Sequence, residues 1–163
     1  MNWLADKIEQ WPTAKLLPYA RNARTHSEDQ VAQIAASIAE FGFTNPILAG
    51  SDGVIVAGHG RLAAAQKLGL ERVPVVVLDH LSQTQRRALV IADNRIAENA
   101  GWDDAMLRIE LEALQLDGFD LDITGFDADA LAELIAGDEP DNEGQTDEDA
   151  VPEVSETPIS RPG

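Results

Sequence analysis

Apolar residues at helical spacing mark the stretch between Ser27 and Gly42. They recur at every third or fourth position and are Val31, Ile34, Ile38 and Phe41. Ser27 and Gln30 match a capping box, in which the Ser hydroxyl accepts from a first-turn amide and the Gln side chain reaches back. We therefore predict an amphipathic helix that ends at Gly42, with Phe41 in the core.

Short apolar runs in the first half of the chain predict a small sheet. Residues 47–49 and 54–57 flank Asp52-Gly53, which is a strong hairpin signal. Residues 73–78 are β-branched and almost uninterrupted, which is typical of a buried strand. Residues 8–11 predict a further short strand, which the following proline ends.

Helical patterns fill most of the remaining chain. Residues 61–68 have helical composition and stop at a glycine, and a second capping box opens a helix over 82–98. Further helices are expected at 102–114 and 127–135, with Asp103 or Asp104 and Asp127 as their caps. Together these elements predict an α/β (α+β) domain with a small sheet, followed by a helical extension.

Charge is distributed unevenly along the 163 residues, whose formal net charge is −17. Residues 1–102 hold ten acids and ten bases, residues 103–137 ten acids and one base, and residues 138–163 nine acids and one base. We therefore predict a neutral domain at 1–102, an acidic helical extension at 103–137 and an acidic tail at 138–163. The tail carries four of the eight prolines and no aromatic residue, which predicts a disordered linker cut short before a further domain.

Composition excludes several classes of protein. Without cysteine there is no disulfide scaffold, zinc-thiolate site, iron–sulfur cluster or thiol nucleophile. No apolar run approaches the roughly 18 residues of a membrane helix and no signal peptide opens the chain, so we expect a cytoplasmic protein without membrane contact. The net charge argues against nucleic acid, but the neutral first domain, where the arginines gather, removes much of that objection.

The sharpest local motif is Gly58-His59-Gly60-Arg61, which joins a predicted strand directly to a predicted helix. The two glycines allow close backbone approach to a ligand, and amides at a helix N-terminus favour an anion. Arg61 adds a forked cation that suits a phosphate, and His59 is a candidate acid or base near neutral pH. We expect a phosphate site here; the alternative is a tight turn with an exposed histidine.

A basic loop precedes the first predicted helix. It contains Arg21, Asn22, Arg24 and His26. Such a loop is able to fold over a phosphate group or a nucleic-acid backbone. The alternative is a solvated basic loop without a ligand.

Three polar residues follow one another on the helix predicted over 82–98. Asp93 and Asn94 are candidate ligands of Mg²⁺, because this ion takes oxygen ligands and shares them with bound phosphates. Asn94 and Arg95 are candidate phosphate contacts. The alternative is that these are ordinary solvated helix charges.

Together the motifs resemble the ParB/sulfiredoxin superfamily, also called the ParB-like nuclease domain. The resemblance rests on residues 17–26, 43–48, 55–61 and 91–95, which come in the order of the family. It implies a small mixed sheet with surrounding helices. Sulfiredoxins carry a reactive cysteine in the turn and this chain has none, so sulfinic-acid reduction is excluded.

In the ParB branch the glycine-to-arginine turn binds a nucleoside triphosphate, usually CTP. By resemblance this role falls on Gly58, Gly60 and Arg61, and contact with phosphate and Mg²⁺ falls on Asp93 and Asn94. The implied cofactor is therefore CTP or ATP with Mg²⁺. ParB relatives dimerise, so a homodimer is a further expectation, although no helix-turn-helix domain is recognisable in this sequence.

The sequence is most similar to the N-terminal ParB-like domain of phage and prophage DNA methyltransferases. Matching runs are Arg-Asn-Ala-Arg-Thr-His, Gly-His-Gly-Arg, Ala-Asp-Asn-Arg and Ala-Gly-Trp-Asp. In that subgroup an acidic linker leads into the methyltransferase domain, whereas no methyl-transfer motif lies within these residues. We therefore expect a nucleotide- or DNA-binding accessory domain of a DNA-modifying protein. The alternatives are a weak metal-dependent nuclease or nucleotide hydrolase that uses His59, and a protein-interaction module with an idle anion pocket.

Overall fold

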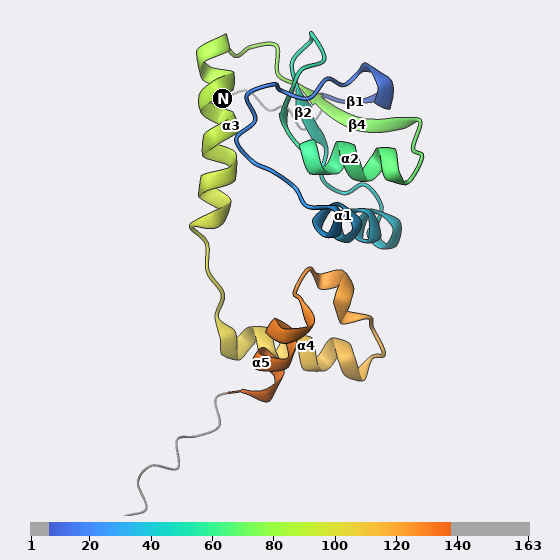
Figure 1. Cartoon of the computed structure of the whole chain (residues 1–163), viewed down its shortest axis with the longest axis vertical. Helices are drawn as coiled ribbons and strands as arrows, with labels where there is room; N and C mark the ends of the chain where they lie inside the picture. Colours follow the sequence, from blue (N-terminus) through green and yellow to red (C-terminus); the bar gives the residue numbers. More distant parts are fainter. Residues whose placement is uncertain (1–6, 138–163) are drawn as a thin grey trace, which may run out of the picture.

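The computed structural model describes residues 7–137, in which helices lie on both faces of a sheet and a small helical unit follows (Figure 1). The predicted tail at 138–163 lies outside the described residues. In chain order the elements are β1 (Ile8–Pro12), η2 (Thr13–Lys15), α1 (Glu28–Phe41), β2 (Ile47–Ala49), β3 (Ile55–Ala57), α2 (His59–Lys67), β4 (Arg72–Val77), α3 (Gln83–Glu98), α4 (Asp104–Leu116), η3 (Leu121–Thr124) and α5 (Ala128–Ala136).

The sheet has four strands in the order β1-β4-β2-β3. Strand β4 pairs antiparallel with β1 and parallel with β2, and β2 and β3 form the predicted antiparallel hairpin. The prediction of a small mixed sheet is therefore confirmed. Because β4 lies inside the sheet and is covered on both faces, its sequence is continuously apolar rather than alternating.

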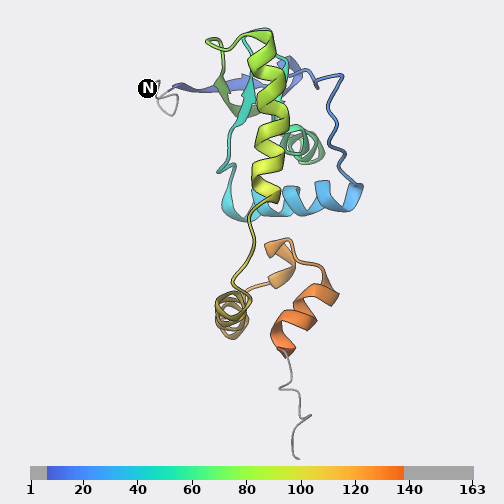
Figure 2. The ribbon, with the colours of Figure 1, turned by 90° about the vertical axis from the view of Figure 1, so that its left-hand side faces the viewer.

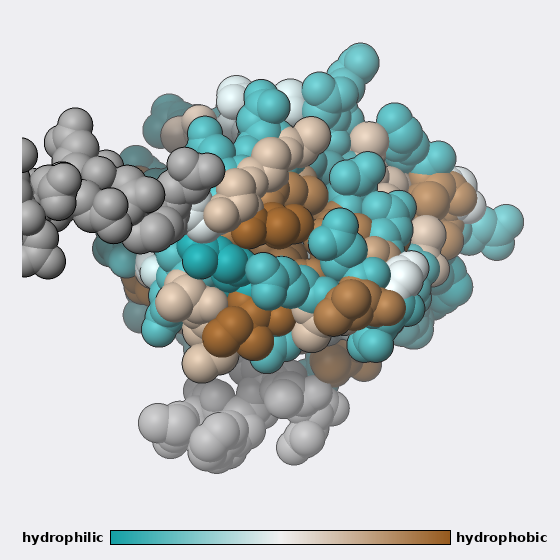
Figure 3. Space-filling model, turned by 90° about the horizontal axis from the view of Figure 1, so that it is seen from below, coloured by the Kyte–Doolittle hydropathy of each residue, from teal (hydrophilic) through white to brown (hydrophobic). Residues whose placement is uncertain are grey.

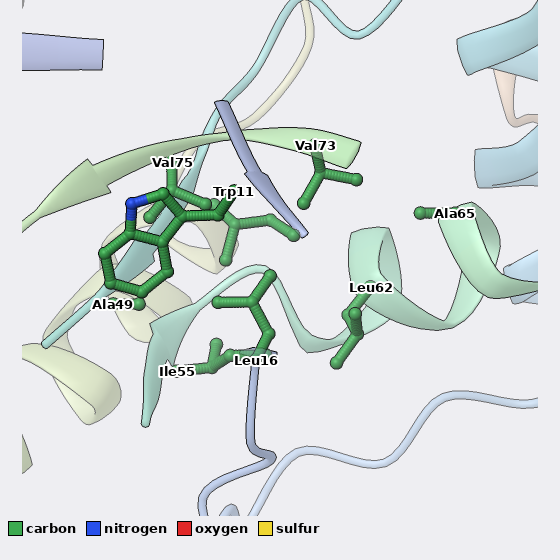
Figure 4. Packing of buried hydrophobic residues seen from close by; sticks show 9 residues of the cluster. Trp11, Leu16, Ala49, Ile55, Leu62, Ala65, Val73 and Val75 are labelled. Carbon is green, nitrogen blue, oxygen red and sulfur yellow. The ribbon is translucent and has the colours of Figure 1, made fainter. Parts of the chain in front are cut away.

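Side chains alternate along β4 between two hydrophobic cores. Figure 4 shows the core on the α2 side, which comprises Trp11, Leu16, Ile47, Ala49, Ile55, Leu62, Ala65, Val73 and Val75. The core on the α3 side comprises Val56, Val76, Leu78 and Val90. Burial on both faces holds α2 and α3 against the sheet, and these two helices carry most of the candidate site residues.

The helix starts follow the predicted caps, with two differences. The capping box of Ser82 and Gln85 is confirmed in both directions. Ser27 accepts from the amide of Gln30 at 3.1 Å, but the Gln30 side chain bonds His26 instead of reaching back to the cap. Helix α2 begins at His59, earlier than predicted, because Gly58 takes a left-handed conformation and serves as its N-cap.

Helices α4 and α5 form a small unit at one end of the molecule, below the sheet in both views (Figures 1 and 2). Its own core consists of Leu111, Leu121 and Leu131. Phe41 of α1 stacks on Phe119, with ring centroids 6.1 Å apart, and Phe41 is 53% exposed. The prediction that Phe41 belongs to the core is therefore wrong, since this ring helps to dock the helical unit on α1.

The end of the molecule that this unit forms carries apolar patches among hydrophilic ones (Figure 3). Exposed hydrophobic side chains on α4 include Met106, Ile109 and Leu116. Within the described part of the chain, no helix is both long enough and apolar enough to cross a membrane.

Candidate anion-binding site

The turn between β3 and α2 depends on a glycine at position 58. Gly58 has φ of 105°, a left-handed conformation that side chains disfavour. A Cβ at this position would lie 3.0 Å from Nε and Nη2 of Arg61, so the guanidinium folds back over the glycine. The sequence therefore places a cation directly at the N-terminus of α2, where the first-turn amides also favour negative charge.

A pocket of about 220 Å³ lies at this helix start, between the loop that precedes α1 and one face of α3. It brings together most of the residues that the sequence analysis proposed. These are Asn22, Arg24, Gly58, His59, Gly60, Arg61, Asp93 and Asn94. Residues more than 60 positions apart in the sequence therefore meet at one site.

Arg61 is the most enclosed cation of the pocket. Its Nε atom is buried and has no hydrogen-bond partner within residues 7–137. Burial lowers the pKa of the Arg61 guanidinium, and the charge of Asp93 partly opposes this effect. Because arginine stays protonated in proteins, the pocket contains a fixed positive charge whose hydrogen-bonding capacity is not fully used.

Arg24 closes the pocket from the loop side by bonding to α3. Its Nη1 donates to Oδ1 of Asn94 over 2.8 Å, and Nδ2 of Asn94 donates to the carbonyl of Val90 over 2.7 Å. Each polar atom of the Asn94 side chain therefore already makes one hydrogen bond within the protein. In this conformation Asn94 holds the Arg24 side chain at the pocket, and it is not an unbonded ligand for a metal ion or a phosphate.

Asn22 shapes the loop instead of facing a ligand. Its Nδ2 donates to the carbonyl of Arg24 at 3.0 Å, and its Oδ1 accepts from the amide of the same residue at 3.3 Å. This short-range turn fixes the backbone from which the Arg24 side chain projects.

His59 holds the start of the same loop. The backbone amide of Tyr19 donates to its Nε2 over 3.0 Å, which requires the ring to be unprotonated at Nε2. Burial lowers the pKa of His59, and the neighbouring His26 lowers that pKa further. The imidazole is thus a neutral anchor between the loop and α2, and its Nε2 is not free for proton transfer.

Two of the proposed arginines lie outside this pocket. Arg21 and Arg95 line a neighbouring open groove of about 740 Å³ along α3, together with Arg87. Arg95 forms an ion pair with Glu98, at 3.3 Å, in which both side chains are largely exposed. Such a pair is weak in water, which agrees with the alternative of solvated helix charges for Arg95.

The residues proposed for Mg²⁺ do not form a metal site by themselves. Asp93 is exposed, and the oxygen of Asn94 is bonded to Arg24. Within residues 7–137 there is no group of three or more His, Cys, Asp or Glu that is placed to hold a metal ion. The side chains therefore do not fit a protein-held Mg²⁺, and no step is assigned to one.

The structure brings His26 of the basic loop into the pocket and adds Gln30, which the sequence analysis did not propose as a site residue. His26 and Gln30 both line it, and Nδ1 of His26 lies 3.1 Å from Oε1 of Gln30. Their position facing α2 was not available from the sequence.

The protein is an α/β domain with a pocket that contains arginines at a helix start, and comparisons with known proteins give its family. The ParB N-terminal domain family matches residues 4–95. The chain is 52% identical over 81 residues to the ParB-like nuclease domain-containing protein YnaK of Escherichia coli. The aligned residues make up 50% of this chain and 93% of YnaK. This chain therefore belongs to the ParB family.

Other relatives are longer chromosome-partitioning proteins. The ParB protein of Treponema pallidum is 39% identical over 82 residues, which represent 47% of this chain but only 24% of that protein. A crystal structure of C-terminally truncated ParB from Caulobacter crescentus, complexed with CTP-γ-S, has a TM-score of 0.57 at 24% identity. It covers 78% of this chain and 70% of that one, and it shows the same fold.

The comparisons also correct one prediction about the acidic extension. Residues 105–162 match the ParB-methyltransferase HTH domain, although no helix-turn-helix domain was expected there. This match covers α5 and all of α4 except its first residue, and a turn and η3 separate the two helices. That family is described by its name as associated with ParB-methyltransferase proteins.

Proposed function

We propose that the chain binds a phosphate-rich ligand, either a nucleoside triphosphate or a DNA backbone, in the pocket at the start of α2. The observation that carries this proposal is the convergence of Arg24 and Arg61 on that helix start, with the buried Nε of Arg61 unpartnered within the described residues. A phosphate supplies acceptors for both guanidinium groups and for the first-turn amides.

Nucleotide binding is supported by the size of the pocket and by the family. A volume of about 220 Å³ suits a chain of phosphates, and the open groove beside it has room for the rest of a nucleotide. The Caulobacter relative was solved in complex with CTP-γ-S. CTP is therefore the first nucleotide to test, and ATP is the second.

DNA contact is expected on the first domain rather than on the helix-turn-helix match. Residues 103–137 contain ten acids and a single base, Arg108. Nε of Arg108 donates to the carbonyl of Leu134 over 2.6 Å, so this guanidinium is engaged inside the unit. Residues 103–137 therefore offer little positive charge to neutralise phosphates, whereas Arg21 and Arg87 line an accessible groove on the first domain.

Binding rather than hydrolysis is the activity that the side chains support. An acid–base role for His59 at Nε2 would require breaking the bond from the Tyr19 amide, and Asn94 would have to release Arg24 to bind a metal. The description of the HTH family as ParB-methyltransferase suggests the context. On that ground the chain would serve as the accessory, DNA-directed part of a DNA-modifying protein.

Calorimetric titration of the whole chain with CTP, ATP and a short DNA duplex tests the proposal, each with Mg²⁺ present. Arg61→Ala is expected to weaken binding of the true ligand by roughly ten- to a hundredfold, since hydrogen bonds between charged groups contribute about 1.5–3 kcal/mol. Lys67→Ala is the matched control, because it removes one positive charge from the exposed far end of the same helix.

Three results would contradict the proposal. Absence of binding by all three ligands would reject the function. Equal binding by wild type and Arg61→Ala would reject the pocket. Equal loss in Arg61→Ala and Lys67→Ala would show that only net charge matters.

A further inference from the structure

We propose that the open groove along α3 is a docking surface for the acidic segment at residues 138–156 of the same chain, which competes there with DNA. We call this groove, of about 740 Å³, the α3 groove. The docking goes beyond the proposed function, because it assigns a protein segment to the groove, whereas the competition rests on the proposed function.

The α3 groove concentrates positive charge. Glu98 is the one acid in its lining, against four arginines, which are Arg21, Arg24, Arg87 and Arg95. All four arginines are exposed. Among residues 7–137, Arg95 pairs with Glu98, and the other three make no ion pair. An acidic ligand would therefore find several cations whose charge the described part of the protein does not balance.

The described elements leave the α3 groove open to a partner. Figure 2 shows α3 in front of the sheet, with the helical unit below it rather than over it. Ile91 lies in the groove lining and is 68% exposed. A partner in the groove would therefore cover apolar surface as well as charge.

A second cavity, of about 340 Å³, continues the α3 groove toward the start of α3. Tyr19, Arg87 and Val90 line both hollows, so the two are continuous. The second cavity adds apolar side chains, among them Leu17 and Val54, and Leu17 is 52% exposed. The combined surface suits an extended segment that carries apolar residues among its acids.

The end of this chain has that composition. Residues 138–163 lie outside the described part of the protein, and their sequence contains nine acids. All nine fall within 138–156, which has no lysine or arginine. Val151 and Val154 stand among the last of these acids. The acids match the arginines of the α3 groove, and the valines match the apolar cavity that continues it.

The length of the segment and its covalent link favour docking within one chain. An extended chain of 26 residues reaches at most about 90 Å, whereas a compact chain of the size of the described part has a radius of gyration of only about 14 Å. A linked segment has an effective concentration in the millimolar range. Ion pairs at an exposed surface are weak individually, so this high local concentration is what makes docking within the same chain favourable.

Paramagnetic broadening in NMR spectra of the whole chain tests the docking without nucleotide or DNA. The chain has no cysteine, so Ser160→Cys provides a single site for a nitroxide label just beyond the acidic segment. At a salt concentration of about 50 mM, we expect broadening of the amides of Ile91 and Arg95. Amides of β1, at the edge of the sheet opposite to β3, should stay sharp. About 1 M salt should remove the broadening, since it screens exposed charges within roughly 3 Å.

Two single substitutions in the labelled chain separate the α3 groove from net charge. Arg87→Gln should lower the ratio of docked to free segment by about 1.5- to fivefold, the effect of one exposed ion pair. Lys67→Gln should leave it unchanged, because it removes the same charge from the exposed end of α2. Sharp α3 amides at low salt, or equal loss in both variants, would overturn the docking. Equal broadening of an unlabelled chain mixed with a labelled one would assign the contact to a second copy and contradict docking within one chain.

Titration with a short DNA duplex at about 50 mM salt tests the competition. A segment that occupies the groove for about half to four fifths of the time weakens DNA binding two- to fivefold, so we expect up to this gain on neutralising its acidic run, in the variant D147N/E148Q/D149N. The control removes the same charge from exposed positions of the helical unit, in the variant E110Q/E112Q/E133Q. An equal gain in both variants, or none in the first, would overturn the competition. If no variant binds DNA while the broadening persists, the proposed DNA contact and the competition are rejected and the docking stands.

Discussion

His59 is predicted to hold the loop before α1 against the start of α2 through one hydrogen bond. Replacing His59 with phenylalanine removes the acceptor of this bond and keeps an aromatic ring. The Tyr19 amide, whose hydrogen bond to Nε2 is 3.0 Å long, would lose its acceptor. An unsatisfied donor costs about 1–3 kcal/mol when buried. The half-buried position of His59 favours the low end, roughly 1 kcal/mol, which corresponds to about a fivefold change in the local opening equilibrium.

Acid should release the same bond in the wild type. Because burial and the nearby His26 lower the pKa of His59 in the folded chain, the unfolded chain binds the proton more readily. The stability that His59 contributes is therefore complete above the ordinary value of 6.5 and is lost as the pH falls through the lowered folded pKa. His59→Phe is expected to show none of this dependence.

Hydrogen exchange of the Tyr19 amide, measured by NMR, reports directly on this hydrogen bond. The protection factor divides out the intrinsic effect of pH on exchange. We expect it to fall about fivefold in His59→Phe at pH 7.5, and to fall in the wild type between pH 7.5 and pH 5, with His80→Gln behaving like the wild type. Unchanged protection in His59→Phe, or a wild-type value that does not depend on pH, would refute the assignment.

Three further predictions concern packing. Gly60→Ala would place a Cβ 2.8 Å from Cδ1 of Ile34. It should therefore destabilise the fold by about 1–3 kcal/mol in thermal unfolding and weaken CTP binding. Gly101→Ala, at a position with open space around it, should change neither the stability nor the binding. A double-mutant cycle of Phe41→Ala and Phe119→Ala in urea should give a coupling energy of about 0.5–1.5 kcal/mol, and a value of zero would mean that the stack does not dock the helical unit. Ile55→Ala, at a fully buried position in the core against α2, should lose about 2–5 kcal/mol in urea unfolding, and a loss below 1 kcal/mol would contradict that packing.

Much of the fold was predictable because its signals are local. The serine cap of α3, the Asp52-Gly53 turn and the apolar run of β4 each act over a few residues, and each is confirmed. Strand order was not predictable, since pairing of β4 with both β1 and β2 depends on contacts between distant segments. The role of Phe41 was wrong for the same reason, because its partner Phe119 belongs to a unit far along the chain.

For the site, too, the local features were predictable from the sequence and the contacts between distant segments were not. The glycine turn could be found because one continuous stretch supplies the glycines, the helix start and Arg61. Spacing alone could not distinguish Arg24, which reaches the pocket, from Arg21 and Arg95, which line the neighbouring groove. The direction of a loop side chain is set by contacts such as the bond from Arg24 to Asn94, which joins residues 70 positions apart.

The charge of residues 103–137 gives no indication of the helix-turn-helix match. A net charge far below zero over residues 103–137 is unusual for a domain class named after DNA-binding helices. The sequence pattern of such a domain depends on apolar positions, here the core of Leu111, Leu121 and Leu131, and these are compatible with an acidic surface. The net charge of a segment therefore indicates which charged partners its surface attracts or repels, and it does not predict the fold of that segment.

A crystal structure of the whole chain grown with CTP and Mg²⁺ would test the central claim most directly. We predict that the phosphates lie at the start of α2, within hydrogen-bonding distance of the guanidinium groups of Arg24 and Arg61. Density for CTP elsewhere on the protein, with no phosphate contact to Arg61, would contradict the account.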